Sequence, residues 1–169
     1  MTGFWPRTNT DIHGTLFFPA VKKSDDMKTI EEYLEKPCWV IDILPQQVPS
    51  DSKGQYFTME RYWMKEPQYG QICQRFCRLL FGLNCYHSFL VYRADSDAWT
   101  SNPQPEELGK WLMDGINLWV VMEQEDAMIT YFKDDLYLSL YKPGEPLLQL
   151  VRQLAAAEGL FVRQGAVFE

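Results

Sequence analysis

Three short apolar segments between residues 118 and 141 constrain the fold of this chain more than any other feature. The segments are Leu118–Glu123, Met128–Lys133 and Leu136–Tyr141, and short acidic stretches separate each one from the next. In the third segment leucine alternates with tyrosine and serine, which is the periodicity of a strand with two chemically different faces. Connections this short join antiparallel neighbours, so we expect an antiparallel meander in this part of the chain.

Helices and further strands are predicted on both sides of this meander. Strand patterns occur at Trp39–Leu44, Gln55–Trp63, Tyr86–Tyr92 and Leu160–Arg163, and helical patterns at Asp25–Glu35, Glu66–Leu83, Pro103–Asp114 and Glu145–Glu158. We expect a loop at Asp95–Asn102. Strands interrupted by a few helices indicate an α+β fold, with a mostly antiparallel sheet of five to seven strands and helices packed on one face. The helices over residues 66–83 and 145–158 are the expected cover.

Length and composition fit a single α+β domain over residues 1–169. The chain is 46% hydrophobic and 23% charged, which is typical of a soluble globular protein. Residues 1–25 contain Pro6, Gly14 and Pro19 and predict an irregular N-terminal arm, with a short strand at Gly14–Ala20. We find no signal-peptide pattern and no apolar run long enough to span a membrane. These features predict a cytoplasmic protein with reduced thiols and no membrane partner.

The charge balance argues against nucleic-acid binding. Lys and Arg number 16 and Asp and Glu number 23, which gives a formal charge of −7. Nucleic-acid binding requires basic patches, and the densest basic positions, Lys22-Lys23 and Arg75 with Arg78, are too small for a groove. An acidic surface instead suits a soluble protein, or one that is steered to a basic protein partner.

The cysteines and histidines offer two possible chemistries, and we expect neither. Cys73, Cys77, Cys85 and His87 have a zinc-like order, but the tight knuckle typical of structural zinc sites is missing. Buried core cysteines explain this pattern better. His87 and His13 are the two histidines, and neither lies in a motif that would activate a cysteine nucleophile. Nucleotide-binding and hydrolase motifs are also missing, so we predict no metal, no cofactor and no catalytic residues.

Asp42 suggests one alternative function. It lies inside the apolar segment WVIDIL, where a buried carboxylate would be costly unless it were paired and would have a raised pKa. On an edge strand the same side chain would face water, and we favour that interpretation. Together with Glu60, His87 and nearby tyrosines, a buried Asp42 would predict a small-molecule-binding or enzymatic pocket.

Aromatic residues make up 15% of the chain, and several tyrosines lie on the polar faces of predicted strands. If the helices cover the leucine face, these tyrosines form an exposed aromatic surface, the kind of surface that anchors protein interfaces. If the N-terminal arm or the helices cover them, they are core residues. With the acidic turn, the predicted partner-binding residues are Tyr62, Tyr131, Tyr137, Tyr141, Glu123, Glu125 and Asp126.

The segment DDLYLSLYKPGEPLLQLVRQLAAAEGLFVR, Asp134–Arg163, is similar to the closing strand–helix–strand of small uncharacterised bacterial domains. Some of these domains resemble the immunity proteins that neutralise polymorphic toxins. WVIDILPQQVP also resembles a segment of an uncharacterised bacterial family. The resemblance transfers no catalytic or binding residue. It implies an immunity-type inhibitor. From all these features we expect a non-enzymatic domain that binds another protein and is itself a monomer or a homodimer. A homo-oligomeric structural subunit, which would bury the same face against its own copy, is a further alternative.

Overall fold

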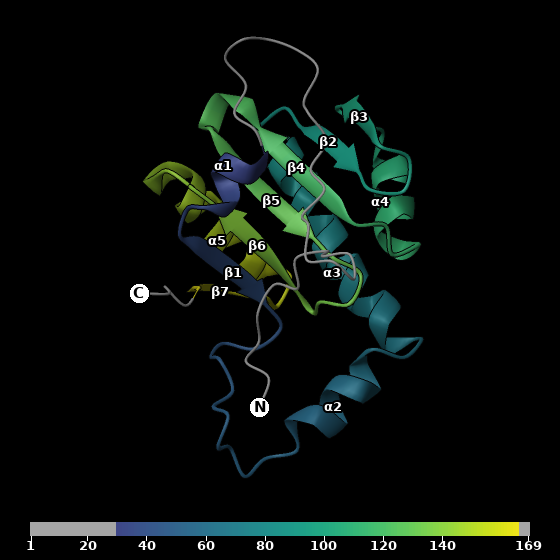
Figure 1. Ribbon diagram of the computed structural model, residues 1–169, viewed down its shortest axis with the longest axis vertical. Coiled ribbons are helices and arrows are strands. Elements are labelled where there is room, and N and C mark those ends of the chain that lie inside the picture. The colour runs from purple at the N-terminus through teal and green to yellow at the C-terminus, as the bar shows by residue number, and fades with distance from the viewer. Residues whose placement is uncertain (1–29, 166–169) are drawn as a thin grey trace.

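The computed structural model describes residues 30–165, and they form an α+β fold built on one antiparallel sheet (Figure 1). The predicted N-terminal arm over residues 1–25 and the strand at Gly14–Ala20 lie outside the described residues. The sheet has seven strands in the order β3-β2-β4-β5-β6-β1-β7. The strands are β1 Cys38–Asp42, β2 Leu90–Arg93, β3 Ala98–Ser101, β4 Leu118–Met122, β5 Ala127–Tyr131, β6 Tyr137–Tyr141 and β7 Phe161–Gln164. The predicted meander is confirmed as β4, β5 and β6 at the centre of the sheet.

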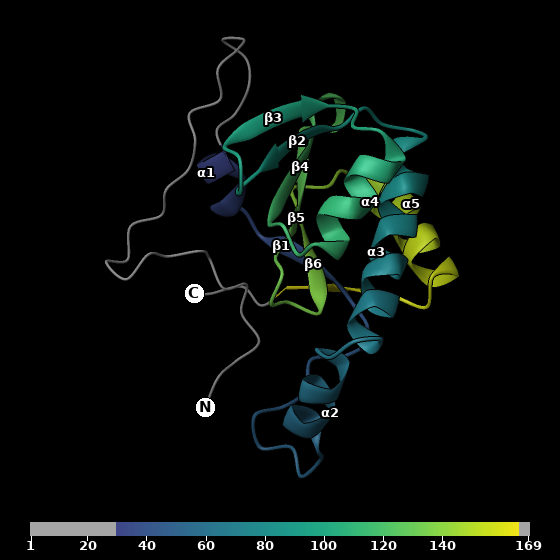
Figure 2. The ribbon, with the colours of Figure 1, turned by 90° about the vertical axis from the view of Figure 1, so that its right-hand side faces the viewer.

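Three helices cover one face of the sheet, and a short helix lies on the other face (Figure 2). The covering helices are α3 Gln68–Asn84, α4 Pro105–Met113 and α5 Glu145–Ala157, and α1 Ile30–Leu34 lies on the opposite face. Helix α3 packs against both α4 and α5. The remaining helix, α2, spans Tyr56–Trp63, and a 3-10 turn, η1, spans Glu123–Glu125. The predicted cover by the helices after residues 66 and 145 is therefore confirmed.

The main core lies between the sheet and these three helices. Phe76, Leu80 and Leu83 recur at helical spacing on α3 and are buried against the sheet. Leu138 and Leu140 of β6 face them. Removing each such side chain from water stabilises the fold by roughly 1.5–3 kcal/mol, so the packing of α3 on the sheet is a major part of the stability.

A second, smaller cluster occupies the opposite face of the sheet. Trp119, Phe132 and Tyr141 pack there with Ile30 and Tyr33 of α1. The alternation predicted for the third meander segment is therefore confirmed: its leucines face the helices and its tyrosines face the other way.

Two predictions of local structure are wrong. Residues 55–63 were expected as a strand but form helix α2. Their apolar alternation does not mark a buried strand face, because Phe57 and Met59 are both exposed. Tyr56 and Trp63, at helical spacing, are the partly buried positions instead. Residues 95–102 were expected as a loop but contain β3, a four-residue edge strand that pairs with β2. Such a short strand gives little sequence signal.

Candidate interaction surface

Helix α2 is an arm that lies beyond one end of the sheet and its covering helices in both views (Figures 1 and 2). None of its eight residues is buried. Phe57, Met59 and Tyr62 are exposed to 56%, 40% and 50% of their surface. Exposed apolar side chains that gather into a patch are typical of interaction sites, so α2 is a candidate interaction surface.

Contacts at the C-terminal end of the arm fix it to the body of the protein. Trp63 and Met64 pack against the main core. The Gln68 side chain of α3 donates a 2.8 Å hydrogen bond to the Tyr62 hydroxyl, and within α2 Arg61 Nε donates to the Phe57 carbonyl at 3.3 Å. The exposed side chains are therefore presented by an ordered helix.

Other exposed apolar side chains lie at the same end of the molecule. Asp42, the last residue of β1, pairs with Tyr137 and Phe161, the first residues of β6 and β7. We call this end of the sheet, from which the chain leads into α2, the α2 end. Phe161 is 43% exposed there, and Met113 is 42% exposed beside Gly70 in the first turn of α3. Tyr86, at the far end of α3, is the exception among the exposed large apolar side chains of the described residues.

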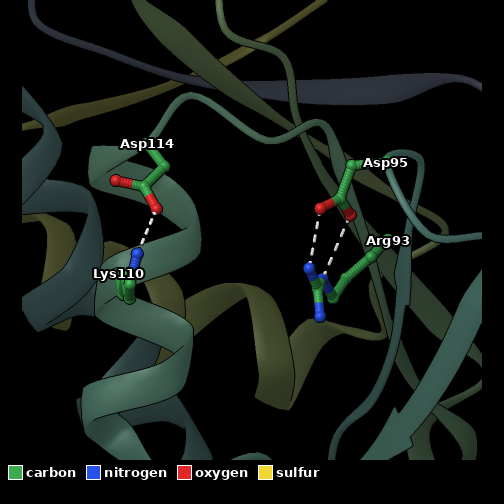
Figure 3. Close-up of polar contacts among 4 residues, drawn as sticks. All are labelled: Arg93, Asp95, Lys110 and Asp114. Atoms are coloured by element: carbon green, nitrogen blue, oxygen red, sulfur yellow. Dashed lines mark hydrogen bonds and ion pairs between the residues drawn. The ribbon is translucent and has the colours of Figure 1, made fainter.

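Two ion pairs join side chains at the end of β2 and along α4 (Figure 3). Arg93 makes two hydrogen bonds to the Asp95 carboxylate, at 2.7 and 3.2 Å, and its guanidinium lies 4.6 Å from the centre of the Trp111 ring. Lys110 donates to Asp114 at 2.7 Å along α4. Exposed ion pairs of this kind contribute at most about 1 kcal/mol each to stability.

Three of the four tyrosines predicted to bind a partner are buried. Tyr131, Tyr137 and Tyr141 are 0%, 3% and 5% exposed, and burial raises the pKa of each hydroxyl. Tyr131 lies on the helix side of the sheet, where its hydroxyl is 2.7 Å from the Tyr69 hydroxyl and donates to the Leu112 carbonyl at 3.0 Å. In the structure these tyrosines belong to the core, so an exposed tyrosine sheet face is not formed. Tyr62 is exposed, but on a helix.

Two side chains of the acidic turn after β4 contact other residues of the same chain. Glu125 lies 3.4 Å from the His87 ring, and the Asp126 carboxylate accepts a hydrogen bond from Tyr33 at 3.2 Å and forms an ion pair with Lys142. Of the three predicted acids, Glu123 is fully on the surface. Strand register places this turn at the opposite end of the sheet from Asp42, because β5 begins beside the end of β6 and the start of β1. The acidic turn and Tyr62 therefore do not share a surface.

Asp42 is buried, which corrects the expectation that it faces water. Strand β1 is not an edge strand, because it lies between β6 and β7, and Asp42 is 3% exposed. One carboxylate oxygen accepts from the Leu44 backbone N–H at 3.1 Å and the other from Arg163 at 2.8 Å. Burial raises the pKa of Asp42 even though Arg163 and these hydrogen bonds lower it.

The three residues of the predicted pocket do not come together. Glu60 accepts a 3.3 Å hydrogen bond from Tyr56 within α2, whereas Asp42 pairs with Arg163 of β7. His87 lies at the other end beside Glu125. A hollow of about 270 Å³ is also located away from Asp42 and Glu60, and its described lining is Glu32, Tyr33, Glu35, Lys36 and Lys142.

The cysteines do not assemble into a metal site. All four are free thiols, with Cys73 and Cys77 buried, Cys38 partly buried and Cys85 exposed. Among residues 30–165, no group of three or more His, Cys, Asp or Glu side chains is arranged to hold a metal ion. In the same part of the chain, no helix is long and apolar enough to cross a membrane.

Comparison with protein-family models, curated proteins and solved structures found no match for this chain. The resemblance of Asp134–Arg163 to immunity-type domains therefore rests on its sequence pattern alone. Sequence reasoning also missed Phe57 and Met59 as surface residues. The signal that could have indicated them is the helical spacing of Tyr56, Glu60 and Trp63, which leaves Phe57 and Met59 outside the face that these three residues form.

Proposed function

We propose that this chain is a non-enzymatic protein-binding domain that inserts α2 into an apolar groove of a partner protein. The observation that carries the proposal is the exposure of Phe57, Met59 and Tyr62 on a helix that buries none of its residues. Insertion of a helix into a groove is a recurring mode of protein recognition, and Met59 and Tyr62, three residues apart, lie on the same side of α2. An immunity-type inhibitor of a bacterial toxin is one role of this kind, and the resemblance of Asp134–Arg163 supports it.

The energetics of the arm favour binding through a few side chains. Aromatic side chains that become buried at the centre of an interface each contribute about 2 kcal/mol or more. The Tyr62 hydroxyl is already held by Gln68, and Trp63 is packed on the core, so less conformational entropy is lost when a partner binds. Because the side chains that α2 exposes most are apolar or aromatic, we expect an apolar groove.

Affinity capture with matched variants tests this function. The wild-type protein, the double variant Phe57→Ala/Tyr62→Ala and the control Tyr86→Ala are used as bait in lysate of the native host. Tyr86 is 68% exposed at the other end of α3, so its loss removes an equally accessible aromatic ring from a different surface. A protein retained by the wild type and by Tyr86→Ala, but lost with the double variant, is the expected result.

Two results would contradict the proposal. One is a partner that binds the double variant as tightly as the wild type, measured by calorimetry with the purified partner. The other is a dimer of this chain in light scattering that dissociates in the double variant, because α2 would then be a contact between two copies. Circular dichroism and melting temperature confirm that each variant is folded before binding is compared.

A further inference from the structure

A single row of side chains crosses the sheet on the face opposite the three covering helices. Strand register aligns one residue from each strand, and from β3 to β7 these are Trp99, Tyr92, Trp119, Thr130, Ser139, Val40 and Arg163. Register partners point to the same side of a sheet, and Tyr92 and Trp119 belong to the second cluster, so the row lies on the α1 side (Figure 2). Neighbouring strands are about 4.8 Å apart, so the row is about 29 Å long.

Most side chains of this row carry a buried polar atom without a hydrogen-bond partner in the described part of the chain. The unpaired N–H donors are Nε1 of Trp99, Nε1 of Trp119 and Nε of Arg163. Burial raises the pKa of Tyr141, and the nearby Thr130 and Ser139 hydroxyls lower it, but neither of the two makes a hydrogen bond of normal geometry. Thr130, Ser139 and Trp119 are 1%, 1% and 5% exposed. Buried polar groups in proteins are almost always paired, so the row requires a cover that carries hydrogen-bond acceptors.

Helix α1 is too short to cover this row. It has five residues, so its axis is about 7.5 Å long. Its Tyr33 hydroxyl donates to Asp126, which places α1 toward the turn after β4. Ile30, the first described residue, is 1% exposed and belongs to the second cluster. Residues 1–29 therefore join the described chain on the same face as the row.

The sequence before Ile30 contains a segment that matches the row in length and chemistry. Gly14–Ala20, GTLFFPA, is mostly apolar and has two phenylalanines at its centre. Seven residues in extended conformation span about 23 Å, which is comparable to the row. The nine residues from 21 to 29 reach up to about 30 Å, enough to bring this segment over the sheet. Its backbone carbonyls are acceptors for N–H donors, and its aromatic rings suit a face rich in tryptophan and tyrosine.

We propose that the row is the docking site of the chain's own segment Gly14–Ala20, which crosses the sheet as an extended peptide. Carbonyl groups of the segment accept hydrogen bonds from the indole N–H groups of Trp99 and Trp119. The side chains of Phe17 and Phe18 pack on the aromatic part of the row. This inference concerns the face opposite α3, α4 and α5 and does not depend on the function proposed for α2.

Nuclear magnetic resonance of the full-length protein tests this docking. In the wild type, nuclear Overhauser effects should connect the Trp119 indole N–H to side chains of residues 14–20. Phe17→Ser should make the indole N–H groups of Trp99 and Trp119 exchange at least about tenfold faster, while the backbone amides of β4 and β5 stay protected. Phe4→Ser changes the same kind of residue outside the docked segment, and this control should leave both indole rates unchanged.

Three results would overturn the proposal. Indole exchange that is equal in Phe17→Ser and the wild type would show that the segment does not cover the row. Wild-type protein without Overhauser effects between residues 14–20 and Trp119 would show the same, and this measurement holds even where Phe17→Ser fails to fold. A dimer in light scattering, with these effects only between labelled and unlabelled chains, would show that the segment docks on a second copy.

Discussion

Helices α2 and α3 follow one another in the chain but differ in what they do with their apolar side chains. Helix α3 buries eight of its 17 residues against the sheet and its neighbouring helices. Helix α2 buries none of its eight, although Phe57, Met59 and Tyr62 are as apolar as the residues that α3 buries. Most helical stability in proteins comes from tertiary packing of an apolar face, and α2 is an exception to this rule. Its apolar side chains are therefore not explained by the fold.

The largest difference should appear when one phenylalanine is removed from each helix. Phe76 of α3 is 1% exposed, so Phe76→Ala should lower the free energy of unfolding by about 3–5 kcal/mol through lost packing and a cavity. Phe57→Ala should change it by less than about 0.5 kcal/mol. Urea denaturation measures both. A large loss in Phe57→Ala would mean that α2 belongs to the core and would remove the basis of the proposed function.

Thiol labelling compares the buried face of α3 with its exposed end. Burial raises the pKa of Cys77 from 9.0 to about 11, which lowers its thiolate fraction about 100-fold at neutral pH. Cys85 follows the last residue of α3 and is exposed. Cys85 should therefore react with a thiol reagent at least 100-fold faster than Cys77, as mass spectrometry of the labelled peptides can show. Equal rates would indicate that α3 separates from the sheet in solution.

Two tyrosine-to-phenylalanine changes give a smaller contrast. The Tyr131 hydroxyl is buried between the Tyr69 hydroxyl and the Leu112 carbonyl, so Tyr131→Phe removes two buried hydrogen bonds and should cost about 1–3 kcal/mol of stability. The Tyr62 hydroxyl accepts a hydrogen bond from Gln68 at the surface, and Tyr62→Phe should cost close to nothing. Thermal unfolding of the two variants under the same conditions tests this contrast.

The smallest predicted effect is the pH dependence that Asp42 contributes. Because its pKa is raised in the folded protein, the folded state takes up a proton more readily than the unfolded state as pH falls toward the usual aspartate range. Relative to Asp42→Asn, the wild type should therefore become more stable as pH falls from about 7 to about 4, by less than about 1 kcal/mol. Denaturation of both proteins over this range gives the difference. The opposite slope would mean that Arg163 outweighs burial at this site.

Sequence periodicity correctly predicted those helices and strands whose apolar spacing matches the residues that they bury. Apolar residues recur every three or four positions in α3 because that whole side is buried, and leucine alternates in β6 because one strand face is buried. Helix α2 was predicted as a strand because its apolar residues face solvent, where spacing is not constrained by packing. Strand β3 was missed because four residues at a sheet edge carry almost no pattern.

The candidate site was harder to predict than the fold for a related reason. Alternation in β6 shows that leucine and tyrosine lie on opposite faces, but it does not show whether the tyrosine face is covered. Tyr137 and Tyr141 proved to be buried, whereas Tyr62 is exposed. Asp42 was expected at an edge because no local signal shows that a strand from the end of the chain pairs beside it. Packing of α1 decides the first case and long-range strand pairing the second, and neither leaves a local pattern in the sequence.

Strand β1 has a consequence for how this protein is made on the ribosome. Its two neighbours, β6 and β7, both come from the last part of the described chain, and the Asp42–Arg163 contact spans 121 residues. At typical rates of synthesis, about 5–20 residues per second, β1 has emerged for several seconds before either neighbour exists. During that time the apolar segment WVIDI has no strand to pair with. The nascent chain therefore has an interval in which β1 is exposed to aggregation, and a chaperone that binds short apolar segments would act there.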